Sequence, residues 1–594
     1  MLALTIDDLL RAYRERRVTP TSVLDTVLAN IEAAPQRNAW ITKLSREQVM
    51  SYARALEGKS PEDLPLFGIP FAIKDNIDLA GVPTTAACAE FAYVPQTSAT
   101  VVQKLIDAGA IPIGKTNLDQ FATGLVGARS PYGAGKNCFD DAYISGGSSS
   151  GSAIAVASGL VSFALGTDTA GSGRVPAAFN NIVGLKPSCG LLSTRGVVPA
   201  CRSLDCVSIF ALTSADAKRV LDVAKGFDAD DAYSRELLLT RGVPAPLRIG
   251  VPRADQLEFF GDADYARLFV DACERARASG ANVVSVDFSA LFETARLLYE
   301  GPWIAERYAA LEKFIEHHPN ALHPVTAKIV GQGREASAVA AFEAQYRLKS
   351  LQRSAELVWK DADILMVPSA GTIYRIDEVE ADPIALNSNL GRYTNFVNLL
   401  DMSALAVPSG FRSDGLPFGI TLIARAGRDD ALVDLGAKLH EAAGLPLGTS
   451  NRILSPIEEV PRLPEGHIAV AVCGAHMSAL PLNPQLTSRH AFLLRATRTS
   501  AAYRFYALPG GPPKRPGLVR VGAAGAAIDV EVWAVPAKEF GSFVAGIPAP
   551  LGIGKVELQD GTWCSGFVCE SWGVQDADEI THCGGWRQYL SART

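Results

Sequence analysis

Two glycine- and serine-rich stretches lie close together in this chain of 594 residues. The first is GGSSSGS at 146–152, and the second is GTDTAGSGR at 166–174. Paired glycines allow a sharp turn that brings backbone N–H groups near a ligand, and the first stretch is too dense in hydroxyls and glycines for an ordinary helix. Amides beside a serine suit acyl transfer, in which donors about 3 Å away stabilise a tetrahedral oxyanion. Two flexible loops would have the same composition.

One lysine lies in an apolar segment upstream of these turns. The run GIPFAIKDNID at 68–78 predicts a short buried strand that carries Lys74. A lysine in such a strand is costly unless it is solvated, paired or deprotonated, so Lys74 is either functional or at a strand end. All eight histidines lie at position 317 or later. One of them could fold back, but a neutral lysine as base and a serine as nucleophile is the simpler hypothesis.

These motifs together resemble the amidase signature family. The pattern consists of IKDN, GGSSSGS, and GTDTAGSGRVPAAF followed by GLKPS at 184–188, and the resemblance covers roughly residues 1 to 450. It implies that Ser172 is the nucleophile, that Ser148 relays a proton and has a cis peptide bond, and that Lys74 is the terminal base. Ser149 and Ser150 compete with Ser148 for the relay role, and only the spacing favours Ser148.

The resemblance also implies how the nucleophile is supported. The oxyanion hole is expected at the backbone amides of Thr169, Ala170, Gly171 and Ser172. Arg174 and Asp205, both usual in the family, are expected to form a structural pair beneath the serine turns.

Composition narrows the class of protein. A net charge of −7 and an isoelectric point near 5.8 argue against a nucleic-acid or anionic-membrane surface. The N-terminus lacks the pattern of a signal peptide, and the weakly polar stretch 153–166 is too short to span a bilayer. The ten cysteines include no CxxC pair and no metal-ligand cluster, which indicates reduced thiols. We expect a soluble cytoplasmic protein.

The elements that would position the site follow an α/β pattern. Between residues 66 and 225, apolar β-rich runs alternate with helical patterns, which predicts a mixed or largely parallel sheet flanked by helices. Helices are predicted after Thr5, at Pro20 to Ala33, at 97–110 and at 262–283. Later runs predict strands that the resemblance returns to the same sheet: 247–254, 362–370, 403–410 and 416–424.

Residues 299–308, YEGPWIAERY, are the predicted site of substrate choice. Gly301 and Pro302 should end one helix and begin another, with Tyr299 at the end of the first and Arg307 in the second turn of the next. An arginine fork matches a carboxylate, although a solvated surface arginine is the more common case. The pattern resembles the allophanate hydrolase branch of the family, in which such residues hold the substrate's carboxylate. Gly124 of GLVG would form a close backbone wall.

A second domain is predicted after a change of composition near residue 441. We expect an amidase domain at 1–445, a linker at 446–466 that is rich in proline, serine and glutamate, and a mainly β domain at 467–594. The last resembles the C-terminal extension of allophanate hydrolases, which is similar to the γ-glutamyl cyclotransferase fold. Its candidate group is His476, for which a structural role is as acceptable as a chemical one. The resemblance implies that this domain processes the first product, by decarboxylation.

The resemblance therefore implies a hydrolase that cleaves allophanate in urea degradation. It implies no metal and no organic cofactor, a urea carboxylase as supplier of the substrate, and a homodimer. Three alternatives stay open: an amidotransferase subunit that delivers ammonia to a partner, a general small-amide amidase, and a non-enzymatic scaffold.

Overall fold

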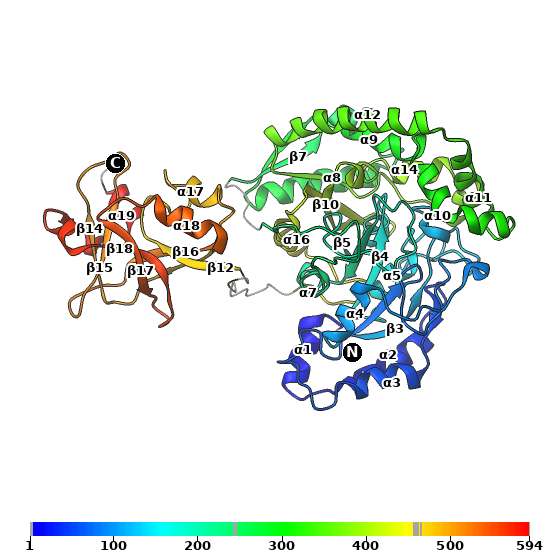
Figure 1. The fold of residues 1–594 in the computed structure, drawn as a ribbon, viewed down its shortest axis with the longest axis horizontal. Coiled ribbons are helices and arrows are strands. Elements are labelled where there is room, and N and C mark those ends of the chain that lie inside the picture. Colours follow the sequence, from blue (N-terminus) through cyan, green and yellow to red (C-terminus); the bar gives the residue numbers. More distant parts are fainter. Residues whose placement is uncertain (1–3, 241–245, 455–462, 464–465, 593–594) are drawn as a thin grey trace. The chain divides into compact units, whose positions relative to one another are not determined.

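The computed structural model describes residues 4–240, 246–454, 463 and 466–592. The chain divides into two compact units, one formed by Met1–Leu239 with Leu247–Pro456 and the other mainly by Ile457–Thr594 (Figure 1). We describe each unit separately. Most of the second half of the predicted linker 446–466 lies outside the described residues, and the predicted domain boundaries stay predictions.

A mixed eleven-stranded sheet forms the centre of the described part of the large unit. The pairs β2–β3, β2–β4, β7–β8 and β7–β9 are parallel, and the other neighbours are antiparallel. In spatial order the strands are β1 (Trp40–Lys43), β3 (Ile111–Thr116), β2 (Pro70–Lys74), β4 (Phe163–Asp168), β6 (Cys206–Ala211), β5 (Val183–Lys186), β10 (Met402–Phe411), β11 (Pro417–Arg425), β9 (Ile364–Pro368), β7 (Arg248–Pro252) and β8 (Asn282–Val286). The α/β prediction is confirmed, and the four later predicted strands all join this sheet.

Helices surround the sheet, with α9 and α12 side by side near one rim of the unit and α1 to α3 at another (Figure 1). The α-helices of this unit in chain order are α1 (Ile6–Arg14), α2 (Pro20–Ala33), α3 (Arg46–Arg54), α4 (Thr100–Asp107), α5 (Ser150–Ala157), α6 (Val175–Phe179), α7 (Ser214–Ala224), α8 (Ala263–Ala278), α9 (Ser289–Glu300), α10 (Trp303–His317), α11 (Pro324–Gly331), α12 (Ala338–Ala355), α13 (Ile376–Ala381), α14 (Ala385–Leu390), α15 (Phe396–Leu399) and α16 (Asp429–Ala443).

Capping side chains explain several helix starts. The hydroxyl of Thr5 accepts the amide of Asp8 at the start of α1, and Asp262 accepts the amide of Tyr265 at the start of α8. One expectation was wrong in part, because α5 begins at Ser150, inside the motif 146–152. The hydroxyl of Ser152 turns inward and donates to the carbonyl of Leu165 at 2.9 Å, so the dense hydroxyls are compatible with a helix.

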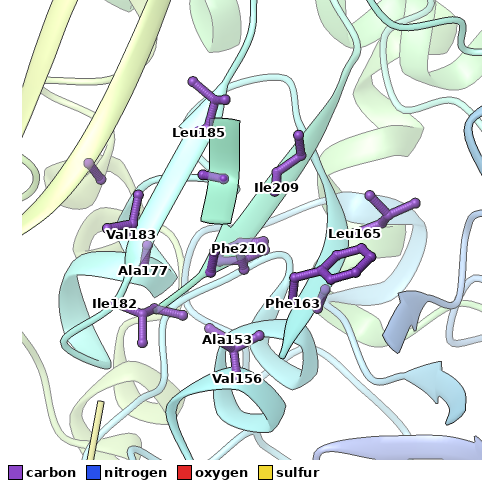
Figure 2. Close-up of a cluster of buried hydrophobic side chains, with 14 of the residues drawn as sticks. Ala153, Val156, Phe163, Leu165, Ala177, Ile182, Val183, Leu185, Ile209 and Phe210 are labelled. Carbon is purple, nitrogen blue, oxygen red and sulfur yellow. The ribbon is translucent and has the colours of Figure 1, made fainter. Parts of the chain in front are cut away.

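The core around the serine-rich segments consists of small and large apolar side chains from α5, α6 and the strands β4, β5 and β6. Figure 2 shows Ala153 and Val156 of α5 with residues of β4, β5 and β6, among them Phe163 and Phe210. The small side chains of α5 let the helix lie close to the sheet. This packing holds the turns at both ends of α5 and β4 in place.

The small unit is mainly β, as predicted. Within the described residues it has a five-stranded sheet in the order β13–β16–β12–β18–β17 and a three-stranded sheet in the order β15–β14–β19. Its likeness to the γ-glutamyl cyclotransferase fold stays a prediction. Its elements are β12 (His467–Val472), α17 (Pro484–Thr487), β13 (Phe492–Arg498), β14 (Tyr503–Ala507), β15 (Pro516–Arg520), β16 (Asp529–Pro536), α18 (Ala537–Ala545), β17 (Leu551–Glu557), β18 (Trp563–Cys569), β19 (Asp578–Glu579) and α19 (Trp586–Ser591).

The helices of the described residues were compared with the length and hydropathy that a bilayer requires. None of them is both long enough and apolar enough to cross a membrane.

Candidate active site

Lys74 and Ser148 meet in the interior of the large unit, as the spacing predicts. The lysine is the last residue of β2, and its Nζ lies 2.7 Å from Ser148 Oγ and 2.7 Å from Thr167 Oγ1. β2 and β4 are parallel neighbours, so their carboxyl ends bring Lys74 and Thr167 to the same edge. Neither Lys74 nor Ser148 is exposed to solvent. The peptide bond between Gly147 and Ser148 is cis, as predicted.

Burial decides the protonation of Lys74. It lowers the pKa of this amine to about 7, although the nearby carboxylates Asp119, Asp205 and Asp168 oppose the shift. A substantial fraction of the amine is therefore neutral at neutral pH. A neutral amine can accept a proton from one hydroxyl while it donates a hydrogen bond to another.

Ser172 lies in the turn between β4 and α6 and is almost fully buried. Its hydroxyl donates to the carbonyl of Gly124 at 3.4 Å, which confirms that Gly124 borders the nucleophile candidate. The competing serines are directed elsewhere: Ser149 Oγ donates to the carbonyl of Thr167 at 3.2 Å, and Ser150 Oγ to that of Asn117 at 3.5 Å. Of the three serines considered for the relay, Ser148 is the one whose hydroxyl contacts Lys74.

The turn that carries Ser172 presents backbone donors. In the described part of the chain, the amides of Thr169, Ala170, Gly171 and Ser172 have no hydrogen-bond acceptor. Gly171 has a φ of +151°, and a Cβ added there would lie 2.4 Å from Thr394 Oγ1. Only glycine fits this point of the turn. The arrangement suits a negatively charged oxygen that these amides would bind.

The expected pair of Arg174 with Asp205 is wrong. Arg174 instead binds Asp168 in a fork, with Nε–Oδ2 and Nη2–Oδ1 distances of 2.9 Å, and neither side chain is exposed. Asp205 accepts the hydroxyl of Thr169 and the amides of Ala200 at 2.8 Å and Cys201 at 3.1 Å. Asp168 is the last residue of β4 and lies only six residues before Arg174. The short turn between them places its carboxylate against the guanidinium. Both carboxylates nevertheless support the turn of Ser172.

The sequence analysis did not identify two further residues of the site, Thr167 and Asp119. The hydroxyl of Thr167 accepts a hydrogen bond from Lys74 Nζ at 2.7 Å. Asp119 accepts the amides of Gly127 at 2.9 Å and Arg129 at 2.8 Å, and its own amide donates to the carbonyl of Ser148 at 3.0 Å. Thr167 lies within the second serine-rich motif, which could have indicated it, whereas nothing in the local pattern distinguishes Asp119.

Tyr299 and Arg307 occupy the predicted places at the end of α9 and in the second turn of α10. The guanidinium carbon of Arg307 lies 6.0 Å from the centre of the Tyr299 ring. Arg307 is only 2% exposed and donates to the carbonyl of Ala122 at 3.4 Å and to Thr123 Oγ1 at 3.3 Å. Its Nε has no partner, and no carboxylate of the described residues forms an ion pair with it. The guanidinium retains free donors beside the loop that borders Ser172.

A cavity of about 530 Å³ is lined by Tyr299 and by residues of α9, α10 and α12. Gly301, Ala305 and Arg347 contribute to its wall. The serine turns do not line it, so it is not the reacting centre.

His476 lies in the small unit, at the border of a cavity of about 70 Å³. Its Nε2 lies 3.0 Å from Gln485 Oε1, and its ring stacks on Phe567 with the ring centres 4.9 Å apart. Burial lowers its pKa, which favours the neutral ring. Arg515 and Cys473 also line the cavity.

Two known protein families match successive parts of this chain. The family described as Amidase matches residues 22–433. The chain belongs to the amidase family. A second match, described as Allophanate hydrolase C-terminal domain, covers residues 468–591. The family agrees with the contact between Lys74 and Ser148.

Individual relatives cover different shares of the chain. Urea amidolyase of Lachancea kluyveri is 44% identical over 96% of this chain, which spans only 32% of that relative. The structure of selenomethionine-substituted allophanate hydrolase from Kluyveromyces lactis is 43% identical, covers 99% of both chains and superposes with a TM-score of 0.87. A glutamyl-tRNA(Gln) amidotransferase component of Streptococcus pneumoniae is 31% identical over 74% of this chain, which covers 96% of that relative.

Proposed function

We propose that this chain hydrolyses allophanate, urea-1-carboxylate, to ammonia and carbon dioxide. The observation that carries the proposal is Arg307, a buried guanidinium without a carboxylate partner among the described residues. Arg307 contacts Thr123, the residue before Gly124, whose carbonyl accepts the hydroxyl of Ser172. Arg307, a group that can bind an anion, therefore lies beside the proposed acyl-transfer centre at Ser172. A small amide that carries one carboxylate is the substrate that such a site fits.

The bond-breaking steps use a proton relay. Neutral Lys74 takes a proton from Ser148, and Ser148 takes one from Ser172, whose hydroxyl rotates away from Gly124. The Ser172 oxygen attacks the terminal amide carbonyl, and the resulting oxyanion is bound by the amides of residues 169–172. The relay then returns the proton to the leaving ammonia. Water deacylates Ser172 by the same route and releases a dicarboxylated amine, which breaks down to ammonia and carbon dioxide.

Substrate orientation depends on three groups. Arg307 offers a planar fork to the carboxylate, the Tyr299 hydroxyl adds a donor, and Gly124 supplies a wall without a side chain. A Cβ at Gly124 would lie 2.6 Å from Asp119 Oδ2. This close packing keeps the backbone near the substrate.

The small unit is proposed to act on the first product. His476 is a neutral, partly exposed ring at a cavity that also contains Arg515. An arginine there can hold a carboxylate that the first reaction leaves, while the histidine exchanges a proton. The match of residues 468–591 to the C-terminal domain of allophanate hydrolases supports this division of labour.

Three expectations about the surroundings of the enzyme also remain proposals. Because the chain corresponds to about a third of a urea amidolyase, a urea carboxylase on the same or another chain would supply the substrate. A homodimer and a cytoplasmic location stay predictions.

An amidotransferase component is the second candidate, since one such relative is 31% identical to this chain. The clamp at Arg307 and the small unit favour a free-standing hydrolase. Ammonia release should be measured with allophanate, malonamate, urea and a neutral aliphatic amide, without partner proteins. We expect release from the two carboxylated amides and none from the Ser172→Ala variant. Release that requires a partner, or that is equally fast with the neutral amide, would contradict the proposal.

A further inference from the structure

Three lysines of the large unit are completely buried, and two of them have partners that explain their state. Lys74 lies between two hydroxyls. Lys115 pairs with Asp75, with an Nζ–Oδ1 distance of 3.1 Å. The third, Lys186 at the end of β5, forms no ion pair with any carboxylate of the described residues. Asp168 acts on this amine from beyond ion-pair distance, and the two cysteines Cys189 and Cys206 favour its charged form more strongly.

Two cysteine sulfurs take the place of that carboxylate. Lys186 Nζ lies 3.7 Å from Cys189 Sγ and 3.6 Å from Cys206 Sγ. The two sulfurs are themselves 3.3 Å apart, with Cys206 as donor to Cys189. Cys206 is buried, whereas Cys189 is partly exposed in the turn after β5. Cys189 is thus the residue of the pair nearer to the surface, and the Cys206 sulfur lies within 3.3 Å of its sulfur.

The charges around the pair favour a thiolate at the exposed position. The hydrogen bond from Cys206 and the charge of Lys186 lower the pKa of the Cys189 thiol, against the effect of burial. Cys206 itself has its pKa raised, chiefly by its hydrogen bond to Cys189. The charges of Asp401 and Arg235 have opposite effects on the pKa of Cys189: Asp401 raises it and Arg235 lowers it. A partly exposed thiolate backed by a thiol is the arrangement of an oxidisable pair.

We propose that Cys189 and Cys206 form a dithiol that a hydroperoxide oxidises to a disulfide, with Lys186 as the cation that holds Cys189 as thiolate. The Cys189 thiolate attacks one oxygen of hydrogen peroxide, so an S–O bond forms and the O–O bond breaks, and the leaving hydroxide takes a proton from the Lys186 ammonium and becomes water. The Cys206 sulfur then attacks Cys189. An S–S bond forms, the S–O bond breaks, and the hydroxide leaves as water with the Cys206 proton. Two electrons pass from the sulfurs to one peroxide.

The geometry requires little movement for this reaction. A disulfide needs a sulfur separation of about 2 Å, so the sulfurs must approach by about 1 Å. Cys189 is in a turn rather than in a strand, and Gly190 follows it with a φ of +75°. The turn can accommodate the approach while β6 keeps its place. Lys186 loses its counter-charge in the oxidised form and is expected to become neutral.

The test is a titration of the reduced full chain with hydrogen peroxide, followed by mass spectrometry of the intact protein and of its peptides. One equivalent should remove two hydrogens and link the peptides of Cys189 and Cys206, and dithiothreitol should reverse the change. The Cys206→Ser variant should instead gain one oxygen at Cys189 that dimedone traps, and the Cys189→Ser variant should gain none there. Lys186→Met should slow the oxidation roughly tenfold or more, because less thiolate is present.

The matched control is Cys583→Ser, which removes another partly exposed cysteine outside the pair and should leave the titration unchanged. The proposal is overturned if the chain forms no link at one equivalent, if the link joins other cysteines, or if a single oxygen bridges Lys186 to a cysteine. Circular dichroism of each variant separates these outcomes from failure to fold. An unchanged rate in a folded Lys186→Met variant would remove the lysine from the proposal.

Discussion

At the scale of single residues, Lys74 makes the proposed hydrolysis depend on pH. Burial lowers its pKa to about 7, and the neutral amine is the form that accepts a proton. As pH falls through this value the ammonium forms, so kcat/KM should decline below neutrality and approach a tenfold loss per pH unit. Initial rates of ammonia release from malonamate, measured across this range, would check the midpoint.

Two controls belong with that pH profile. Circular dichroism at each pH excludes unfolding as the cause of the decline. Lys74→Met should lack activity at every pH, since the relay acts as one unit. A profile that stays level well below neutrality would assign the base to another group.

Arg307 governs selectivity at the same scale. Charge-assisted hydrogen bonds contribute about 1.5–3 kcal/mol each, so loss of a fork in Arg307→Ala should lower kcat/KM for allophanate by about two to four powers of ten. Arg307→Lys should recover part of this, because it keeps the charge without the fork. Tyr299→Phe should cost less. Malonate should inhibit the parent enzyme and fail to inhibit Arg307→Ala; normal hydrolysis by that variant would reject the clamp.

At the scale of elements, the parallel pair β2 and β4 positions the base through Thr167. Thr167→Val removes the hydroxyl that lies 2.7 Å from Lys74 Nζ. The substitution leaves the volume of the side chain nearly unchanged. One hydrogen bond is worth about 1 kcal/mol, so kcat should fall about three- to tenfold with the fold intact. Ammonia-release kinetics and thermal denaturation measure the two effects.

The control for Thr167 is another buried threonine on a neighbouring strand. Thr116 of β3 lies opposite Lys74 in the sheet register, but its hydroxyl hydrogen-bonds Ser152 at 2.8 Å and not the amine of the lysine. Thr116→Val should destabilise the protein by a similar amount but leave kcat near the parent value. Equal kinetic effects of the two substitutions would mean that Thr167 has only a structural role.

The elements also show what local sequence determines. Caps and apolar periodicity predicted α1, α2 and α8 closely, because the signals lie within the helix itself. Motif spacing led to Lys74 and Ser148, whose side chains meet in the structure, and the role of Ser172 stays a prediction. The partner of Arg174 could not be predicted, because Asp168 and Asp205 lie at similar depths and only the packed turn decides between them. Thr167 lies within a motif that could have indicated it, whereas the contacts of Asp119 are made only by the folded loops.

At the scale of the whole molecule, the residues proposed for amide cleavage all belong to the large unit. A chain that ends at residue 454 should therefore still release ammonia from allophanate. If the small unit processes the product, this shortened chain should accumulate a carboxylated intermediate, and His476→Ala in the full chain should do the same. Carbon-13 NMR of the products would detect it. Identical products from all three proteins would leave the small unit without a chemical role.

The place of β10 in the sheet has a consequence for synthesis on the ribosome. β10, residues 402–411, pairs directly with β5, residues 183–186. More than 200 residues separate them, which corresponds to on the order of tens of seconds of translation. During that interval the nascent chain carries β5 as an open strand edge, a template for unwanted pairing. Expression of this enzyme should therefore depend on chaperones that bind the growing chain before residue 402 emerges.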